Sequence, residues 1–182
     1  VEEAVLNKAL ILTTTNGAVA LTKAKHARVC YVASFVNLSA VIQALEETEN
    51  LDTSELVILC SGQEDAFSLE DATCAGMLIA RFLPNHHIAL LSDSARAALS
   101  VFQQYDGDIQ RTLLESDHGR ALQALGFSEN IQTASALDSV PLVPVLEQTV
   151  IKKRLVFDEA LRQEMENRGA APLRWFVIAT QA

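Results

Sequence analysis

Two polar loops, each following a predicted strand, hold the residue types best suited to chemistry. The first covers residues 13–17, with the sequence TTTNG, and precedes a predicted helix. Backbone N–H groups at the start of a helix, with threonine hydroxyls beside them, suit an anion such as phosphate. The same residues would also make an ordinary strand-to-helix connection with a Thr or Asn cap, which is the commoner role of an isolated TTNG. The spacing alone leaves both interpretations open.

The second polar loop starts at Ser61 and Gly62 and ends at Ser68, where a helix is predicted to begin. Glu70 and Asp71 are adjacent carboxylates in the first turn of that helix, and their oxygens could hold a hard cation. Mg²⁺ typically takes one or two carboxylates together with substrate phosphate and waters. Acidic residues also favour the first helical turn because of the helix dipole alone. Without further observations, this second explanation is the stronger one.

Other polar residues have simpler or equally balanced explanations. Cys60 ends a predicted strand and could be a thiolate nucleophile, but no basic residue lies near it in sequence to lower its pKa. His118, beside Gly119, lies at a predicted helix break, from which an imidazole could reach a cleft as acid, base or phosphate contact. A capping or surface role is equally expected for it. His86 and His87 are adjacent and cannot easily face one metal ion.

Short apolar runs alternate with helical patterns along the chain. Strands are predicted at residues 9–13, 28–33, 55–60 and 173–179. Helices are predicted at residues 38–47, 69–83, 95–105, 109–125 and 158–168. The run at 55–60 is apolar nearly throughout, as strands covered on both faces tend to be. This alternation favours a three-layer α/β/α fold with a mostly parallel or mixed sheet, in which ligands sit at the carboxyl ends of strands.

Composition excludes several classes of protein. The chain has 182 residues, enough for a single α/β domain, with 14 basic and 23 acidic side chains and a net charge of -9. Nucleic-acid binding needs clustered Lys and Arg, which are scattered here. No apolar run approaches the roughly 20 residues of a membrane helix, and no signal-peptide pattern is present. The three cysteines lack metal-site spacing and indicate buried thiols in a reducing compartment. We therefore predict an acidic, cytoplasmic protein.

Taken together and in this order, the polar motifs resemble those of the 2-phosphosulfolactate phosphatases. The matching segments are TTTNG, CSG shortly before SLEDATCAG, LLSDSA, SDHGRALQALGF and LDSVPLVP. The first two are the most specific, and the resemblance covers about Lys8 to Val145.

The resemblance implies an Mg²⁺-dependent phosphatase that hydrolyses (R)-2-phospho-3-sulfolactate to 3-sulfolactate and phosphate, a step that in methanogens belongs to coenzyme M biosynthesis. It also implies an α/β/α architecture with a mixed sheet. It assigns substrate contacts to Thr14, Thr15, Asn16, Gly17, Ser61, Gly62, Ser116 and Gly119. It assigns metal binding to Glu70 and Asp71, and catalysis to Asp71 and His118.

The charge of the chain bears on the same expectation. A protein of net charge -9 can bind a phosphorylated, sulfonated acid only if a cation and local N–H donors reverse the field inside the cleft. A bound Mg²⁺ ion is therefore expected on electrostatic grounds as well. The expected partner is a small phosphorylated anion, not nucleic acid or a membrane, and a homodimer is compatible with the sequence.

Two departures from the family pattern keep alternatives open. The family's amino-terminal part, with an arginine-bearing segment resembling DVLRATTT, has no match here, and residues 150–182 form a tail without a recognised counterpart. The chain is accordingly expected to be the carboxyl-terminal part of a larger phosphatase domain. The alternatives are a phosphatase of another 2-phospho acid and a non-catalytic homologue that acts as a binding module.

Overall fold

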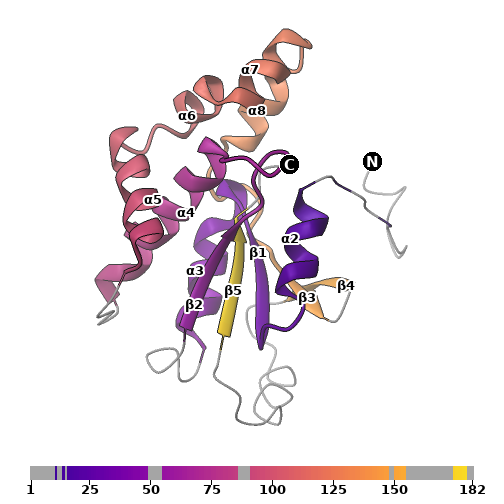
Figure 1. Ribbon diagram of the computed structural model, residues 1–182, viewed down its shortest axis with the longest axis vertical. Helices are drawn as coiled ribbons and strands as arrows, with labels where there is room; N and C mark the ends of the chain where they lie inside the picture. The colour runs from indigo at the N-terminus through magenta and orange to yellow at the C-terminus, as the bar shows by residue number, and fades with distance from the viewer. Residues whose placement is uncertain are drawn as a thin grey trace.

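The computed structural model describes residues 11, 14, 16–48, 55–85, 91–147, 150–154 and 174–179. Within these ranges the chain is a mixed α/β structure, as predicted (Figure 1). Its helices are α2 (Gly17–Ala24), α3 (Leu38–Glu46), α4 (Leu69–Phe82), α5 (Asp93–Gln104), α6 (Ile109–Glu115), α7 (Asp117–Ala124) and α8 (Ser128–Ala134). Its strands are β1 (Val29–Ala33), β2 (Glu55–Cys60), β3 (Val143–Glu147), β4 (Val150–Arg154) and β5 (Arg174–Ala179). Short 3₁₀ turns cover Phe35–Asn37 and Leu83–Asn85.

The five described strands form one mixed sheet in the order β2-β5-β1-β3-β4. Strand β5 runs parallel to both β1 and β2, with Trp175 opposite Val29 on one side and Leu56 on the other. Strands β3 and β4 continue the sheet in antiparallel pairing beyond β1. The yellow strand in Figure 1 therefore lies between two strands from the first third of the chain. The segment beyond residue 149 supplies a central strand of this sheet.

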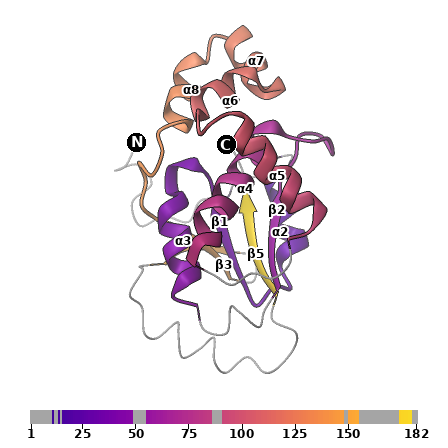
Figure 2. The ribbon, with the colours of Figure 1, turned by 90° about the vertical axis from the view of Figure 1, so that its left-hand side faces the viewer.

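Alternate side chains of β1 enter two different apolar clusters. Tyr31 and Ala33 join the larger cluster, to which α3 and α4 contribute Leu45 and Leu78. Cys30 joins a smaller cluster with Ala24 of α2, and the partly buried Leu59 of β2 packs against it. The period of two along a strand explains this division, because successive side chains point to opposite faces. Helix α2 thus covers one face of the sheet, and α3 and α4 cover the other (Figure 2).

Most of the predicted elements that lie within the described residues are confirmed, with two differences. Strand β2 is only half-buried, because it is the outermost of the described strands on its side. The helix predicted over 109–125 breaks at Ser116, two residues before the expected position. The strand predicted at 9–13 lies almost wholly outside the described residues, and the helix predicted at 158–168 lies entirely outside them. Among the described helices, none has both the length and the apolar character needed to cross a bilayer.

The start of α3 is held by a carboxylate from a distant loop. Asp138 accepts hydrogen bonds from the Ser39 backbone N–H at 2.7 Å and from the Ser39 hydroxyl at 2.6 Å. The Arg81 guanidinium of α4 lies 3.4 Å from the same carboxylate. Burial raises the pKa of Asp138, but the two Ser39 hydrogen bonds and Arg81 lower it by more, so the pKa lies below its ordinary value. This contact joins α3 and α4 to the segment that leads into β3.

Asp138 is expected to make folding stability depend on acid pH. A carboxylate with a depressed folded pKa stabilises fully above its unfolded pKa of about 3.9, and this contribution is lost as pH falls through the folded value. We expect Asp138→Ala to lower the free energy of unfolding by about 1–2 kcal/mol at pH 7. The difference between the two proteins should shrink as pH falls from about 5 through the depressed folded pKa. Urea unfolding across that range tests this, and a difference that stays constant would contradict it.

Candidate active site

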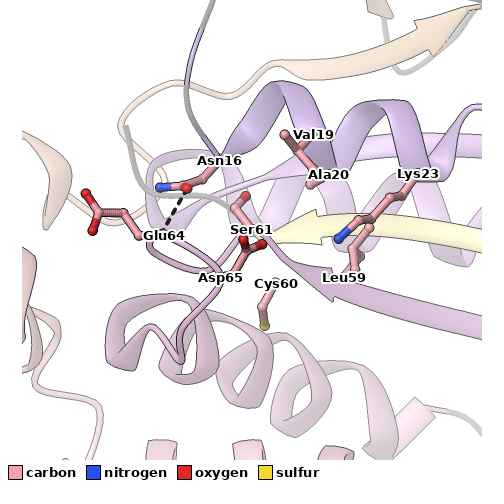
Figure 3. Close-up of a pocket in the computed structure, with 9 residues that line it drawn as sticks. All are labelled: Asn16, Val19, Ala20, Lys23, Leu59, Cys60, Ser61, Glu64 and Asp65. Carbon is pink, nitrogen blue, oxygen red and sulfur yellow. Dashed lines mark hydrogen bonds between the residues drawn. The ribbon is translucent and has the colours of Figure 1, made fainter.

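A pocket of about 280 Å³ opens where α2 meets the carboxyl end of β2 (Figure 3). Its described lining residues come from α2, from the end of β2 and from the loop that follows β2. They are Asn16, Val19, Ala20, Lys23, Leu59, Cys60, Ser61, Glu64 and Asp65. The pocket therefore brings together both polar loops predicted from the sequence, at the edge of the sheet where ligands of α/β proteins usually bind.

One face of α2 forms a wall of this pocket. Asn16, Ala20 and Lys23 follow one another at spacings of four and three residues, which places them on the same side of a helix. The Thr14 hydroxyl oxygen accepts a hydrogen bond from the Ala18 backbone N–H at 3.0 Å, so Thr14 satisfies a free donor of the first helical turn. Thr15, which the motif also contains, lies outside the described residues.

Asn16 joins the two predicted loops directly. Its carboxamide Oδ1 accepts a hydrogen bond from the Glu64 backbone N–H at 3.1 Å. Glu64 and Asp65 form a tight two-residue turn, across which Gln63 and Ala66 exchange backbone hydrogen bonds of 3.1 and 2.8 Å. The turn residues have φ values of 50° and 63°, in the left-handed region that non-glycine residues seldom adopt. Both residues line the pocket, and Figure 3 shows the Glu64 carboxylate turned away from the other lining residues.

Asp71, in the first turn of α4, fixes the beginning of the same loop. Its Oδ2 accepts a hydrogen bond from the Gly62 backbone N–H at 2.9 Å. Gly62 has a φ of 72°, and a Cβ there would lie 2.8 Å from the Ala66 carbonyl oxygen, so a side chain at this position would clash. The Ser68 hydroxyl in turn accepts the Asp71 backbone N–H at 3.2 Å, which confirms the predicted helix start. Asp71 and Glu70 are only 3% and 5% exposed, and neither is among the described lining residues.

The SDHG motif forms a corner between α6 and α7. The Ser116 hydroxyl accepts the Gly119 backbone N–H at 2.9 Å and donates to the Leu113 carbonyl at 3.0 Å. A Cβ on Gly119 would lie 1.7 Å from the Leu113 carbonyl oxygen, so the corner needs a glycine. Ser116 and Gly119 are buried, and His118 is half-buried. None of these three is among the described residues that line the pocket.

Comparison with known proteins identifies the family. The family model for 2-phosphosulpholactate phosphatase matches residues 1–149. The chain belongs to the 2-phosphosulfolactate phosphatase family. A protein of Caldicellulosiruptor saccharolyticus named probable 2-phosphosulfolactate phosphatase is 31% identical over 153 residues, which are 84% of this chain and 63% of the relative. One of Prochlorococcus marinus with the same name is 34% identical over 144 residues, 77% of this chain and 58% of the relative. The chain thus spans about three fifths of the length of these relatives.

Within this phosphatase family member, the pocket contains a thiol that the sequence predicted to be buried. The prediction is confirmed for Cys30 and Cys74, whereas Cys60 is exposed as a residue although its thiol is largely removed from water. Figure 3 shows its sulfur turned toward α4. Removal of this thiol from water, and then the nearby Asp71 carboxylate, raise the pKa of Cys60 to about 12. The thiol is therefore protonated at neutral pH and is not a nucleophile, as its sequence neighbours indicated.

Three charged residues that line the pocket were not singled out from the sequence. They are Lys23, Glu64 and Asp65. Lys23 could have been found from its spacing of seven residues from Asn16, which is close to two helical turns. The turn at Glu64 and Asp65 lacks the Asn-Gly pair that usually signals this geometry, so the sequence held no comparable sign of it. Among the described residues, no group of three or more His, Cys, Asp or Glu side chains could hold a metal ion together.

Proposed function

We propose that this chain provides part of an Mg²⁺-dependent phosphatase that hydrolyses (R)-2-phospho-3-sulfolactate to 3-sulfolactate and phosphate. One observation carries the proposal. Asn16 and Ser61, which come from the two most specific family motifs and are far apart in sequence, line one pocket at the carboxyl end of β2. The pocket is small, near the lower limit of usual ligand sites, and its size suits a short phosphorylated acid.

Within this proposal, the two polar loops bind the substrate. Asn16 and Ser61 are the family-motif residues with neutral polar side chains among the described lining, and they contact the anion. Gly17 and Gly62 follow them directly, and Thr14 and Thr15 complete the first loop. Ser116 and Gly119 are proposed to act by shaping the corner that carries His118, because the Ser116 hydroxyl already accepts one hydrogen bond and donates another. His118 remains the proposed acid or base, since an imidazole can carry a proton near neutral pH.

The proposed ligands of Mg²⁺ are Glu70 and Asp71. They fit the ion in their chemistry, because carboxylate oxygens are its preferred protein ligands and Asp71 lies directly against the loop that lines the pocket. When bound, the ion would polarise the phosphoryl oxygens and orient the attacking water. Asp71 also has a role that needs no metal, because its bond to the Gly62 N–H fixes the end of β2. A three-layer α/β/α arrangement of the complete protein belongs to the same proposal.

Phosphate release from synthetic (R)-2-phospho-3-sulfolactate tests the proposal. We expect the purified chain to release phosphate with Mg²⁺ and to lose this activity in a chelator. A panel of 2-phospho acids without the sulfonate is the matched control, since preference for one of them would favour the alternative substrate class. No release from any of them at micromolar protein would contradict the phosphatase proposal. The chain covers about three fifths of its relatives' length, and that outcome would favour a binding module.

A further inference from the structure

Lys23 is a positive charge in the pocket that has no partner in the described part of the protein. It lines the pocket from the last turn of α2. Within the described ranges, its ammonium makes neither an ion pair nor a hydrogen bond. The other charged lining residues, Glu64 and Asp65, do not pair with it either. An unpaired cation in a concave site can serve an anionic ligand, so Lys23 calls for a functional explanation.

The position of Lys23 on α2 sets how far apart two ligand groups would lie. Asn16 and Lys23 are seven residues apart, about 10 Å along a helix axis. Helical side chains lean toward the amino-terminal end, so the ammonium reaches back toward Asn16 and shortens this separation. Figure 3 shows the Lys23 nitrogen turned toward the side of the pocket that Leu59 and Ser61 form. The pocket thus offers neutral polar groups near the start of α2 and a cation from its last turn.

The walls between these polar groups are apolar. Val19, Ala20 and Leu59 complete this part of the lining. Lys23 itself is exposed, so its attraction for an anion comes from its charge and its hydrogen-bond donors at a concave site, not from burial. An ammonium is a compact charge with three rotatable donors, so it can meet the three oxygens of a tetrahedral acid group without the flat geometry that arginine favours. The site therefore suits a short molecule with one anionic group at each end.

We infer that Lys23 binds one of the two acidic groups that the proposed substrate carries besides its phosphate. In the proposed substrate that group is the sulfonate or the carboxylate, and for the identity of the ligand this inference rests on the proposed function. Lys23 would then select phosphorylated acids over simple phosphate monoesters. Without its charge, the described lining has no positive residue, whereas the acidic residues Glu64 and Asp65 remain. Loss of Lys23 should therefore weaken the binding of anions strongly.

Calorimetric binding of 3-sulfolactate to the full chain tests this inference without requiring turnover. We expect Lys23→Gln to weaken the binding of 3-sulfolactate by about tenfold or more, as loss of a charge-assisted hydrogen bond does. Lys23→Arg, which keeps the charge, should retain most of the affinity. Lys25→Gln is the matched control, because this substitution removes the same charge two residues away. Lys25 is exposed like Lys23 but is not among the described residues that line the pocket. This control should leave the affinity unchanged.

Binding of lactate, which has the carboxylate without the sulfonate, distinguishes the two acid groups. A loss confined to 3-sulfolactate assigns Lys23 to the sulfonate, and an equal loss for both ligands assigns it to the carboxylate. Equal affinities of wild type and Lys23→Gln, or equal losses in Lys23→Gln and Lys25→Gln, would overturn the inference. So would a wild-type chain that does not bind 3-sulfolactate at millimolar concentration. A chain that binds 3-sulfolactate through Lys23 but releases no phosphate would contradict the proposed function and leave the inference standing.

Discussion

Replacing Val177 by proline is expected to unfold the sheet. Val177 lies in β5, opposite Tyr31 of β1 and Ile58 of β2, so its backbone is between two strands. Proline has no N–H to donate and is found in sheets almost only at edges or bulges. The missing hydrogen bond and the steric clash of the ring should together lower the free energy of unfolding by about 3 kcal/mol or more. Urea unfolding followed by circular dichroism measures this loss.

A second proline serves as the control. Val150 is the first residue of β4, which pairs with β3 alone among the described strands, and its side chain is 55% exposed. Proline is tolerated at the first residue of an edge strand, so Val150→Pro should cost less than about 1 kcal/mol. If both variants were equally stable, β5 would not lie between β1 and β2 in the sheet.

Replacing Asp71 should affect activity and stability in different ways, depending on the new residue. Asp71→Ala removes the acceptor of the Gly62 N–H and should lower the free energy of unfolding by about 1–3 kcal/mol. Asp71→Asn keeps an oxygen acceptor of the same size, so its stability should stay within about 1 kcal/mol of wild type. If Asp71 also binds Mg²⁺, the asparagine variant should lose phosphatase activity by about a hundredfold or more, since it lacks the carboxylate charge.

The two variants together separate positioning from metal binding. An asparagine variant that is stable, inactive and unable to respond to added Mg²⁺ would support a metal ligand. An asparagine variant that is stable and fully active would show that Asp71 only positions the loop after β2, and it would contradict the predicted role of Asp71 as a metal ligand. Glu70→Gln, in the neighbouring buried position, reports independently on the second predicted carboxylate. Phosphate release at several Mg²⁺ concentrations is the measurement.

The features that the sequence predicted correctly depend on neighbours in the chain. Ser68 caps α4 through a hydrogen bond to the N–H group three residues later, so residue types and spacing were enough to place this helix start. Strand β2 likewise followed from a run of consecutive apolar residues. Two of the predicted contact residues, Asn16 and Ser61, line the pocket. Asn16 directly precedes α2 and Ser61 directly follows β2, so the ends of these two elements place them there.

Features that depend on distant pairing could not be predicted in the same way. A strand near residues 173–179 was expected, but its place between β1 and β2 is set by tertiary contacts that leave no trace in local periodicity. The burial of Glu70 and Asp71 is of the same kind, because it follows from how α4 packs under the loop after β2. An acidic pair in a first helical turn would ordinarily be taken as solvated.

The position of β5 has a consequence for how the protein folds. Among the described strands, β1 and β2 do not pair with each other but both pair with β5, which lies more than a hundred residues later in the chain. Long-range pairing of this kind slows folding because loop-closure entropy is lost first. Until β5 pairs with them, β1 and β2 each have an unpaired backbone edge that other molecules can reach. Such edges can accept the same strand from a second chain. Refolding at high protein concentration should therefore yield exchanged, intertwined species in competition with the monomer.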